Sequence, residues 1–291
     1  ALIVPYFPVA CILFLAKQEL LLYHRKRGDT MKRIESRDNK WIKRLNGLKI
    51  KKNRDKEGLF IAEGLRFIRE IPKNWEVLAY AVSNAFAAEN DLSLYEEKAE
   101  VLCLTDALFA AVCDTENPQG ILAVCKKLDW DADAVLAKKT PFLLLAEELN
   151  DPGNLGTVIR TADACGADAV FLSKGSVDLY NPKVLRATMG SLFHVPVFQN
   201  IDLHALSEKM QAKQIPLYAA HLKGNRYPYA LPLQDACAFL IGNEARGLSE
   251  DAAALCDAWV KIPMPGQAES LNASVAAGVL LYEVVRQRLP K

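Results

Sequence analysis

Three separated stretches in the second half of the chain combine residue types that can bind an anion or a nucleotide. They read NDPGNLGTVIR (residues 150–160), IGNEARGL (241–248) and IPMPGQAESLNAS (262–274). Each places Gly, Asn and small residues after an apolar run, where a strand of an α/β protein ends and backbone N–H and C=O groups are free to hold a ligand. Together they predict one composite pocket.

The first stretch leads into a predicted helix over residues 155–165. Arg160 would then lie about one turn into the helix, where its guanidinium can turn toward an anion held at the helix N-terminus. An ordinary capped helix with a surface arginine explains the same residues. Taken alone, this motif leaves both interpretations open.

The other two stretches are equally ambiguous when taken singly. The second sets Glu244 and Arg246 between two glycines, which permit positive φ and close backbone approach; a polar turn would have the same composition. In the third, a strand ends at Ile262 and Ser270 precedes a predicted helix over 273–289. Small residues at the start of that helix indicate very close packing: Ala273, Ala276, Ala277 and Gly278.

Several classes of protein lose support from what the sequence lacks. There is no G-x-x-x-x-G-K-[ST] phosphate loop, and no G-x-G-x-x-G follows a first strand. The seven cysteines never form a C-x-x-C pair, which favours a reducing cytoplasm and no zinc or iron–sulfur site. The four histidines have no carboxylate or cysteine at metal-ligand spacing, so no metal is expected.

Charge is segregated along the chain. The net charge is +1, but residues 17–73 contain 18 Lys/Arg and 8 Asp/Glu, so the remainder carries about −9. Within this segment the pattern of Trp41, Ile42, Leu45 and Leu48 predicts an amphipathic helix with lysines and arginines on its other faces. Such a basic segment is typical of phosphate binding, although a solvated lysine-rich surface has the same charge.

The length of 291 residues, of which 51% are hydrophobic, favours two domains. Strands at 59–62, 77–82, 100–104 and 121–124, with helices at 63–70, 85–94 and 106–112, predict a small α/β domain over 32–126. Residues 127–140 are charged and alanine-rich and form the expected linker. Residues 1–31 are interpreted as an extension, with Met31 as the natural start, because organised patterning begins only there.

The second domain, over 141–291, alternates strands with helices, which predicts a mainly parallel sheet covered on both faces. The predicted strands are 142–146, 169–172, 195–198, 217–220, 238–241 and 259–262. The predicted helices are 155–165, 182–189, 203–212, 249–255 and 273–289. The first 16 residues are too short for a confident membrane span, which needs about 20 residues, so no membrane association is expected.

In order and spacing, the three stretches resemble the three motifs of the SpoU (TrmH-like) RNA ribose 2′-O-methyltransferases of the SPOUT superfamily. The similarity covers about 142–289. Residues 32–126, with FIAEG at 60–64 and GILAV at 120–124, resemble the ribosomal-protein-like substrate-binding domain of the rRNA branch. The resemblance implies an α/β fold in which a parallel-sheet SPOUT domain with a deep trefoil knot follows a small α/β RNA-binding domain. It also implies a homodimer and S-adenosyl-L-methionine as cofactor.

Carried over by motif, the resemblance assigns roles to individual residues. Backbone contacts to the cofactor come from Gly242, Ile262 and Leu271. The reaction centre is lined by Asn154, Arg160, Glu244, Ser270 and Asn272. Because a free guanidinium is a poor base, we expect Arg160 to hold a phosphate and stabilise charge on the attacking 2′-oxygen, with that phosphate or a water taking the proton. Asn243, beside the glycine of the second motif, departs from the family pattern.

The basic front domain would then bind the RNA, with large-subunit (23S) rRNA favoured over tRNA. Its expected phosphate contacts are Lys40, Lys43, Arg44, Lys49, Lys51, Lys52 and Arg54. Three other interpretations stay open at this point: a tRNA 2′-O-methyltransferase, a non-catalytic RNA-binding or ribosome-assembly protein with the same fold, and a small-molecule α/β enzyme with a basic appendage.

Overall fold

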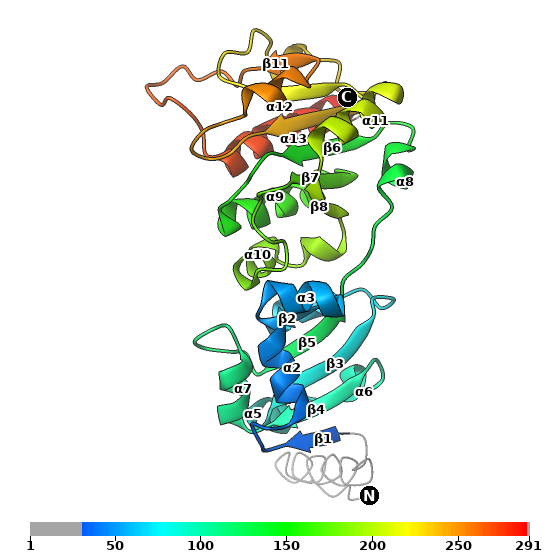
Figure 1. The fold of residues 1–291 in the computed structure, drawn as a ribbon, viewed down its shortest axis with the longest axis vertical. Helices are drawn as coiled ribbons and strands as arrows, with labels where there is room; N and C mark the ends of the chain where they lie inside the picture. Colours follow the sequence, from blue (N-terminus) through cyan, green and yellow to red (C-terminus); the bar gives the residue numbers. More distant parts are fainter. Residues whose placement is uncertain (1–30, 290–291) are drawn as a thin grey trace, which may run out of the picture.

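Two β-sheets, one in each half of the chain, organise the protein. The computed structural model describes residues 31–289, and the two sheets follow one another along its longest axis (Figure 1). The predicted extension therefore falls outside the described residues, apart from Met31. Among the described residues, no helix is long and apolar enough to cross a membrane.

The N-terminal sheet has the strand order β1-β4-β3-β5-β2, with β5 antiparallel to both of its neighbours. Its strands are β1 (Met31–Ile34), β2 (Leu59–Glu63), β3 (Val77–Ser83), β4 (Glu100–Leu104) and β5 (Ile121–Lys126). Its helices are α2 (Lys40–Leu48), α3 (Lys51–Glu57), α4 (Leu65–Arg69), α5 (Asn84–Glu89), α6 (Ser93–Glu96) and α7 (Asp106–Val112).

The C-terminal sheet has the order β11-β9-β10-β6-β7-β8, and all of its pairings are parallel, which confirms the prediction. Its strands are β6 (Phe142–Ala146), β7 (Ala169–Ser173), β8 (Val197–Ile201), β9 (Leu217–Ala220), β10 (Cys237–Ile241) and β11 (Ala258–Val260). Its helices are α8 (Ala132–Leu136), α9 (Pro152–Ala164), α10 (Pro182–Thr188), α11 (Leu203–Ala212), α12 (Glu250–Ala254) and α13 (Ala273–Arg288), with short 3₁₀ turns η1 (Ser191–Phe193) and η2 (Pro228–Ala230).

Strand side chains alternate between two apolar cores, as the period of two in a strand requires. In β6, Phe142 and Leu144 face the core that contains α9 and α13, whereas Leu143 and Leu145 face the core that contains α8 and α11. The sheet is therefore covered on both faces. All five residues of β6 are buried, which explains why it appears in the sequence as an unbroken apolar run.

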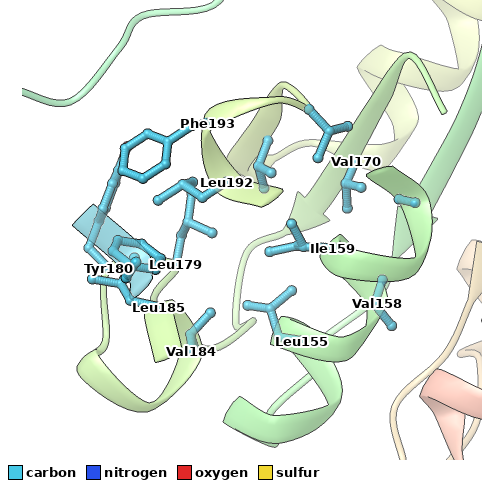
Figure 2. Close-up of a cluster of buried hydrophobic side chains, with 14 of the residues drawn as sticks. Leu155, Val158, Ile159, Val170, Leu179, Tyr180, Val184, Leu185, Leu192 and Phe193 are labelled. Atoms are coloured by element: carbon cyan, nitrogen blue, oxygen red, sulfur yellow. The ribbon is translucent and has the colours of Figure 1, made fainter. Parts of the chain in front are cut away.

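The two halves of the molecule share one apolar core. Phe60 on β2 lies 4.8 Å from Tyr180, measured between ring centroids, and Trp75 lies 4.7 Å from Phe193 in an edge-on arrangement. Figure 2 shows Tyr180 and Phe193 beside the apolar side chains of α9 and α10. Buried aromatic pairs of this kind hold the sheets in a defined relation rather than as freely jointed bodies.

Arg54 corrects one prediction made from the sequence. It is 5% exposed and does not lie on the RNA-accessible surface. Its guanidinium donates to the carbonyls of Leu48 (2.9 Å) and Lys49 (2.8 Å) and to the carboxylate of Asp178 (2.5 Å). Because Asp178 follows β7, this ion pair joins the predicted RNA-binding helices to the C-terminal half of the molecule.

Some element boundaries also differ from those predicted. Strand β1 was not predicted, and the helix expected at 85–94 is two short helices, α5 and α6. The expected linker contains α8, whose Val135 and Leu136 are buried against the C-terminal sheet. The sequence did not predict this helix, because only two of its side chains are buried and two apolar residues do not give a helical pattern.

We predict that Arg54→Ala will lower the free energy of unfolding by about 3–5 kcal/mol, because it leaves the largely buried Asp178 carboxylate without its cation. Urea denaturation measures the change. Lys52→Ala, at an exposed position of the same helix α3, is the matched control and should alter stability by less than about 0.5 kcal/mol. Equal stability of the two variants would contradict the buried-pair argument.

Candidate active site

The parallel pairing of β6 with β10 brings the first two motifs together. Ala146 at the end of β6 is in register with Ile241 at the end of β10, and the amide of Glu147 continues the ladder to the Ile241 carbonyl (2.9 Å). The loops that follow β6 and β10 therefore both start at the same edge of the sheet. Residues far apart in sequence therefore meet at the carboxyl ends of the central strands, where α/β sheets bind ligands.

The carboxylate of Glu244 joins these two loops. It accepts hydrogen bonds from the backbone amides of Asn150 (3.3 Å) and Asp151 (3.0 Å) and from the side-chain amide of Asn154 (3.2 Å). All three donors belong to the first motif, whereas Glu244 belongs to the second. A charged acceptor is well suited to this position because it can satisfy several donors at once.

Asn272 brings the third motif into the same network. Its side-chain nitrogen donates to Oδ1 of Asn154 (2.9 Å), while its own Oδ1 caps α13 by accepting from the amides of Ser274 (2.9 Å) and Val275 (3.3 Å). Asn154 is thereby oriented from both ends. The three motifs form one connected hydrogen-bonded junction, Glu244–Asn154–Asn272.

Glu244 is held as a carboxylate. Burial raises the pKa of Glu244, but four hydrogen bonds to its carboxylate lower that pKa by more, and the pKa lies below its ordinary value of 4.5. The donors are the Asp151 amide, the amide of Glu244 itself, the Asn154 side chain and the Asn150 amide. These donors stabilise the charged form. Glu244 is therefore ionised at neutral pH and serves as an acceptor in the junction.

A cavity of about 350 Å³ lies beside the junction. Its lining includes Gly242, Ile262 and Leu271, the three residues predicted to contact a cofactor through their backbones, together with Ser270 and Glu244. Its volume falls in the range of small-molecule sites, about 300–1,000 Å³. Exposed backbone from two strand ends and an apolar wall suit a nucleoside-sized ligand.

Gly242 is required for the shape of this cavity. A Cβ atom there would lie 2.2 Å from the carbonyl carbon of Gly247, which no real side chain tolerates. The 243–247 loop folds back through paired backbone hydrogen bonds between Asn243 and Gly247 (3.0 and 2.9 Å). The second motif is thus a tight hairpin turn as well as a cavity wall.

Arg160 occupies a different position from the one predicted. Helix α9 begins at Pro152 with Asp151 as its N-cap, so Arg160 lies roughly two turns beyond the N-terminus. That distance removes the argument from the helix dipole, which acts within the first turn. The side chain is exposed, makes no hydrogen bond to any of residues 31–289, and does not line the cavity.

Three acidic residues support the site without having been singled out from the sequence. Glu147 accepts from the Ser249 amide (2.8 Å) and hydroxyl (2.6 Å), and Glu148 pairs with Arg246. Asp151 caps α9 by accepting from the Asn154 amide (2.7 Å). Their position soon after a buried strand could have indicated this role from the sequence. The backbone N–H groups beyond a strand end have no strand partner, and carboxylates can accept hydrogen bonds from them.

Asn243, which follows the glycine of the second motif, has a structural role. Its side-chain nitrogen donates to the carbonyl of Glu148 (2.8 Å), and its Oδ1 accepts from the amides of Ala245 (2.9 Å) and Arg246 (3.2 Å). The residue also borders the cavity. It stabilises the turn that shapes the cavity rim.

The predicted RNA-binding lysines and arginines, Arg54 apart, lie on α2, α3 and the turn between them. Arg44 pairs with Glu57 (2.7 Å) and Lys51 with Asp55 (3.0 Å). Lys49 donates to the carbonyls of Ala111 (3.2 Å) and Cys113 (3.0 Å). Exposed ion pairs of this type are weak, worth about 0–1 kcal/mol, so they hold the charged side chains of Arg44 and Lys51 only loosely.

Comparison with known proteins agrees with the geometry. Residues 141–282 match the SpoU rRNA Methylase family, and residues 39–123 match the MRM3-like substrate binding domain. The 23S rRNA (guanosine(2553)-2′-O)-methyltransferase RlmP of Bacillus subtilis is 37% identical over 256 residues, which cover 87% of this chain and 99% of that protein. The chain belongs to the SpoU rRNA methylase family.

Solved structures of this family match almost the whole chain. The AdoMet-bound rRNA methyltransferase of Sinorhizobium meliloti has a TM-score of 0.80 at 27% identity, covering 90% of this chain and 100% of that one. AviRb of Streptomyces viridochromogenes in complex with AdoMet has a TM-score of 0.77 at 29% identity, covering 86% and 98%. The protein is an RNA ribose 2′-O-methyltransferase, and its cofactor is S-adenosylmethionine.

We predict that Glu244→Gln will lower the free energy of unfolding by about 1 kcal/mol at pH 7, because a neutral amide accepts less strongly from three donors. The wild-type advantage is present above the ordinary carboxyl pKa of 4.5 and is lost as the pH falls through the lower folded pKa. Urea denaturation across this range tests it. The exposed Glu208→Gln on α11 is the control; a wild-type advantage that persisted at the acid end would contradict the prediction.

Proposed function

We propose that this protein methylates a ribose 2′-hydroxyl in 23S rRNA, and that it works in the cytoplasm. The observation that carries the proposal is the junction Glu244–Asn154–Asn272 beside a cavity of cofactor size. Relatives that match most of the chain are named 23S rRNA 2′-O-methyltransferases, which favours rRNA over tRNA and a catalytic over a non-catalytic role. The six described cysteines are free, as suits a reducing compartment.

The cavity residues hold the cofactor through backbone groups. Gly242, Ile262 and Leu271 surround the adenosine part, and the turn closed by Asn243 forms the rim. When bound, S-adenosylmethionine supplies an electrophilic methyl group. Because a Cβ atom on Gly242 would overlap the backbone of Gly247, glycine at this position lets the turn close against the strand end that borders the cavity.

The junction presents polar groups to the RNA ribose. Asn154, fixed by Glu244 and Asn272, and the exposed Ser270 present polar groups toward the ribose. Arg160 on the exposed face of α9 holds the neighbouring phosphate and stabilises negative charge that develops on the 2′-oxygen. The proton passes to that phosphate or to a water, since a guanidinium is a poor base.

We divide the chain into an RNA-binding domain at 32–126, a connecting segment at 127–140 whose helix α8 packs on the second domain, and a catalytic domain at 141–291. The lysines of α2 and α3 contact phosphates of folded RNA and position the target nucleotide. We also infer that the C-terminal part is threaded as a trefoil knot. Support comes from β11 lying outside β9 while α13 returns to pack on α9 and β10.

We further propose that the protein is a homodimer that associates through α13. One face of this helix exposes apolar side chains at helical spacing, with exposed fractions of 51% for Val275, 41% for Val279 and 55% for Tyr282. A contiguous apolar stripe along a long helix is typical of a protein–protein interface. Polar contacts complete such an interface at its rim.

The wild-type protein should transfer methyl groups from S-adenosylmethionine to unmodified 23S rRNA, detected as 2′-O-methylation at a single nucleotide. Arg160→Ala should abolish turnover and leave cofactor affinity within about twofold, because Arg160 does not line the cavity. Turnover follows incorporation of labelled methyl groups, and calorimetry measures cofactor binding. An active Arg160→Ala enzyme would disprove the assigned role, and transfer to tRNA alone would disprove the proposed substrate.

Val279→Asp should convert the dimer to a monomer, because it buries a charge in the apolar interface at a cost of several kcal/mol. Light scattering over a range of protein concentrations measures the mass. Gln211→Glu adds a negative charge on the exposed face of α11 and serves as the control. A wild-type protein that is already monomeric, or a Val279→Asp variant that remains dimeric, would contradict the interface.

A further inference from the structure

The segment 221–230, which follows β9 and ends with η2, is largely exposed, basic and aromatic. It reads HLKGNRYPYA and contains no acidic residue. Leu222 is 54% exposed, Tyr227 43% and Tyr229 59%. Single exposed tyrosines are ordinary on a protein surface, but two of them beside Lys223 and Arg226 form a surface with a specific chemistry.

The exposed tyrosines are stacked on one another. The ring centroids of Tyr227 and Tyr229 lie 5.2 Å apart with an interplanar angle of 14°. At the start of the segment, the ring of His221 packs against Trp259 in a tilted arrangement, with the centroids 4.3 Å apart and an interplanar angle of 31°. Flat rings whose outer faces remain in solvent offer a surface on which a further planar group can stack.

Backbone hydrogen bonds fix the segment in place. The His221 amide donates to the Val260 carbonyl (2.9 Å), and the Lys261 amide donates to the Arg226 carbonyl (2.8 Å). A Cβ atom on Gly224 would lie 2.7 Å from the Lys261 nitrogen, so the backbone at Gly224 lies directly against the backbone at Lys261. Pro228, which stands between the two tyrosines in the sequence, is buried. A ligand would therefore meet rings that are already ordered.

The segment adjoins the cofactor cavity. His221 and Leu222 are part of the cavity lining, and the strand β11 to which the segment is bonded leads directly to Ile262 on the same wall. A polymer that presents one ribose at the cavity must continue across neighbouring surface. Segment 221–230 is part of that surface.

We propose that segment 221–230 is a stacking platform for unpaired nucleotides of the substrate RNA that flank the methylated ribose. This inference rests on the proposed function. Bases stack on Tyr227 and Tyr229, because every base has an aromatic face, and Lys223 and Arg226 neutralise the adjoining phosphates. Segment 221–230 contains no carboxylate that would repel the phosphates of RNA. The catalytic domain then holds the strand beside the target, while α2 and α3 hold the folded body of the RNA.

The test compares Tyr227→Ala/Tyr229→Ala with Tyr227→Phe/Tyr229→Phe, which keeps both rings. The probe is a single-stranded oligouridine of about twelve nucleotides, long enough for one such site, and an unmodified 23S rRNA transcript serves for turnover. The alanine pair should weaken oligouridine binding about fivefold to a hundredfold, and the phenylalanine pair less than twofold. Lys223→Gln/Arg226→Gln should reduce the slope of log affinity against log salt by about 1.4.

Cofactor affinity by calorimetry and mass by light scattering should be unchanged in all variants. The platform is overturned if the alanine pair binds oligouridine like wild type, or if the phenylalanine pair is as weak as the alanine pair, since stacking is then not the cause. It is also overturned if the alanine pair changes the oligomeric state, which would make the surface an interface between copies of the chain. Tyrosine-dependent binding without rRNA methylation would instead count against the proposed function alone.

Discussion

The arrangement of the site depends on one carboxylate that satisfies backbone donors at the end of the sheet. In the loop that follows β6, the amides of Asn150 and Asp151 have no strand partners, and Glu244 in the loop after the neighbouring strand β10 accepts from both. The same carboxylate orients Asn154, which Asn272 holds from its other side. The three loops are therefore linked by one network of hydrogen bonds in which a single carboxylate satisfies several donors.

A second constraint joins substrate binding to catalysis. The aromatic contacts of Phe60 and Trp75 and the buried pair of Arg54 with Asp178 tie the N-terminal sheet to the segments around α10. Helix α10 in turn packs on α9 so closely that a Cβ atom on Gly156 would lie 2.2 Å from that of Ala187. The helix that carries Arg160 is thus coupled by rigid packing to the part of the molecule proposed to bind RNA.

The chemistry proposed for the site depends on three separate parts: the cavity, the hydrogen-bonded junction and Arg160. The cavity proposed to hold the cofactor is lined by apolar side chains such as Ile241, Ile262 and Leu271 together with polar ones such as Glu269 and Ser270. The polar side chains gather in the junction, and Arg160 remains exposed on α9, unpaired with any of the described residues. Such an arginine is ready to meet a phosphate without first breaking a salt bridge, which suits a reaction that develops charge on a ribose oxygen.

The sequence by itself determined the elements with a strong apolar signal, such as the unbroken apolar runs of β6 and β9 and the amphipathic pattern of α2. It also determined the family, because three motifs in order are specific even when each alone is not. It did not determine α8 or the start of α9, where short or proline-led helices give little periodic signal. Only the tertiary structure decided that Arg54 is buried in an ion pair, that Arg160 lies far from the helix N-terminus and that the rings of Tyr227 and Tyr229 stack on one another. The physical reason is that burial and partnership of a polar side chain depend on residues distant in sequence, whereas periodicity records only which face of an element is apolar.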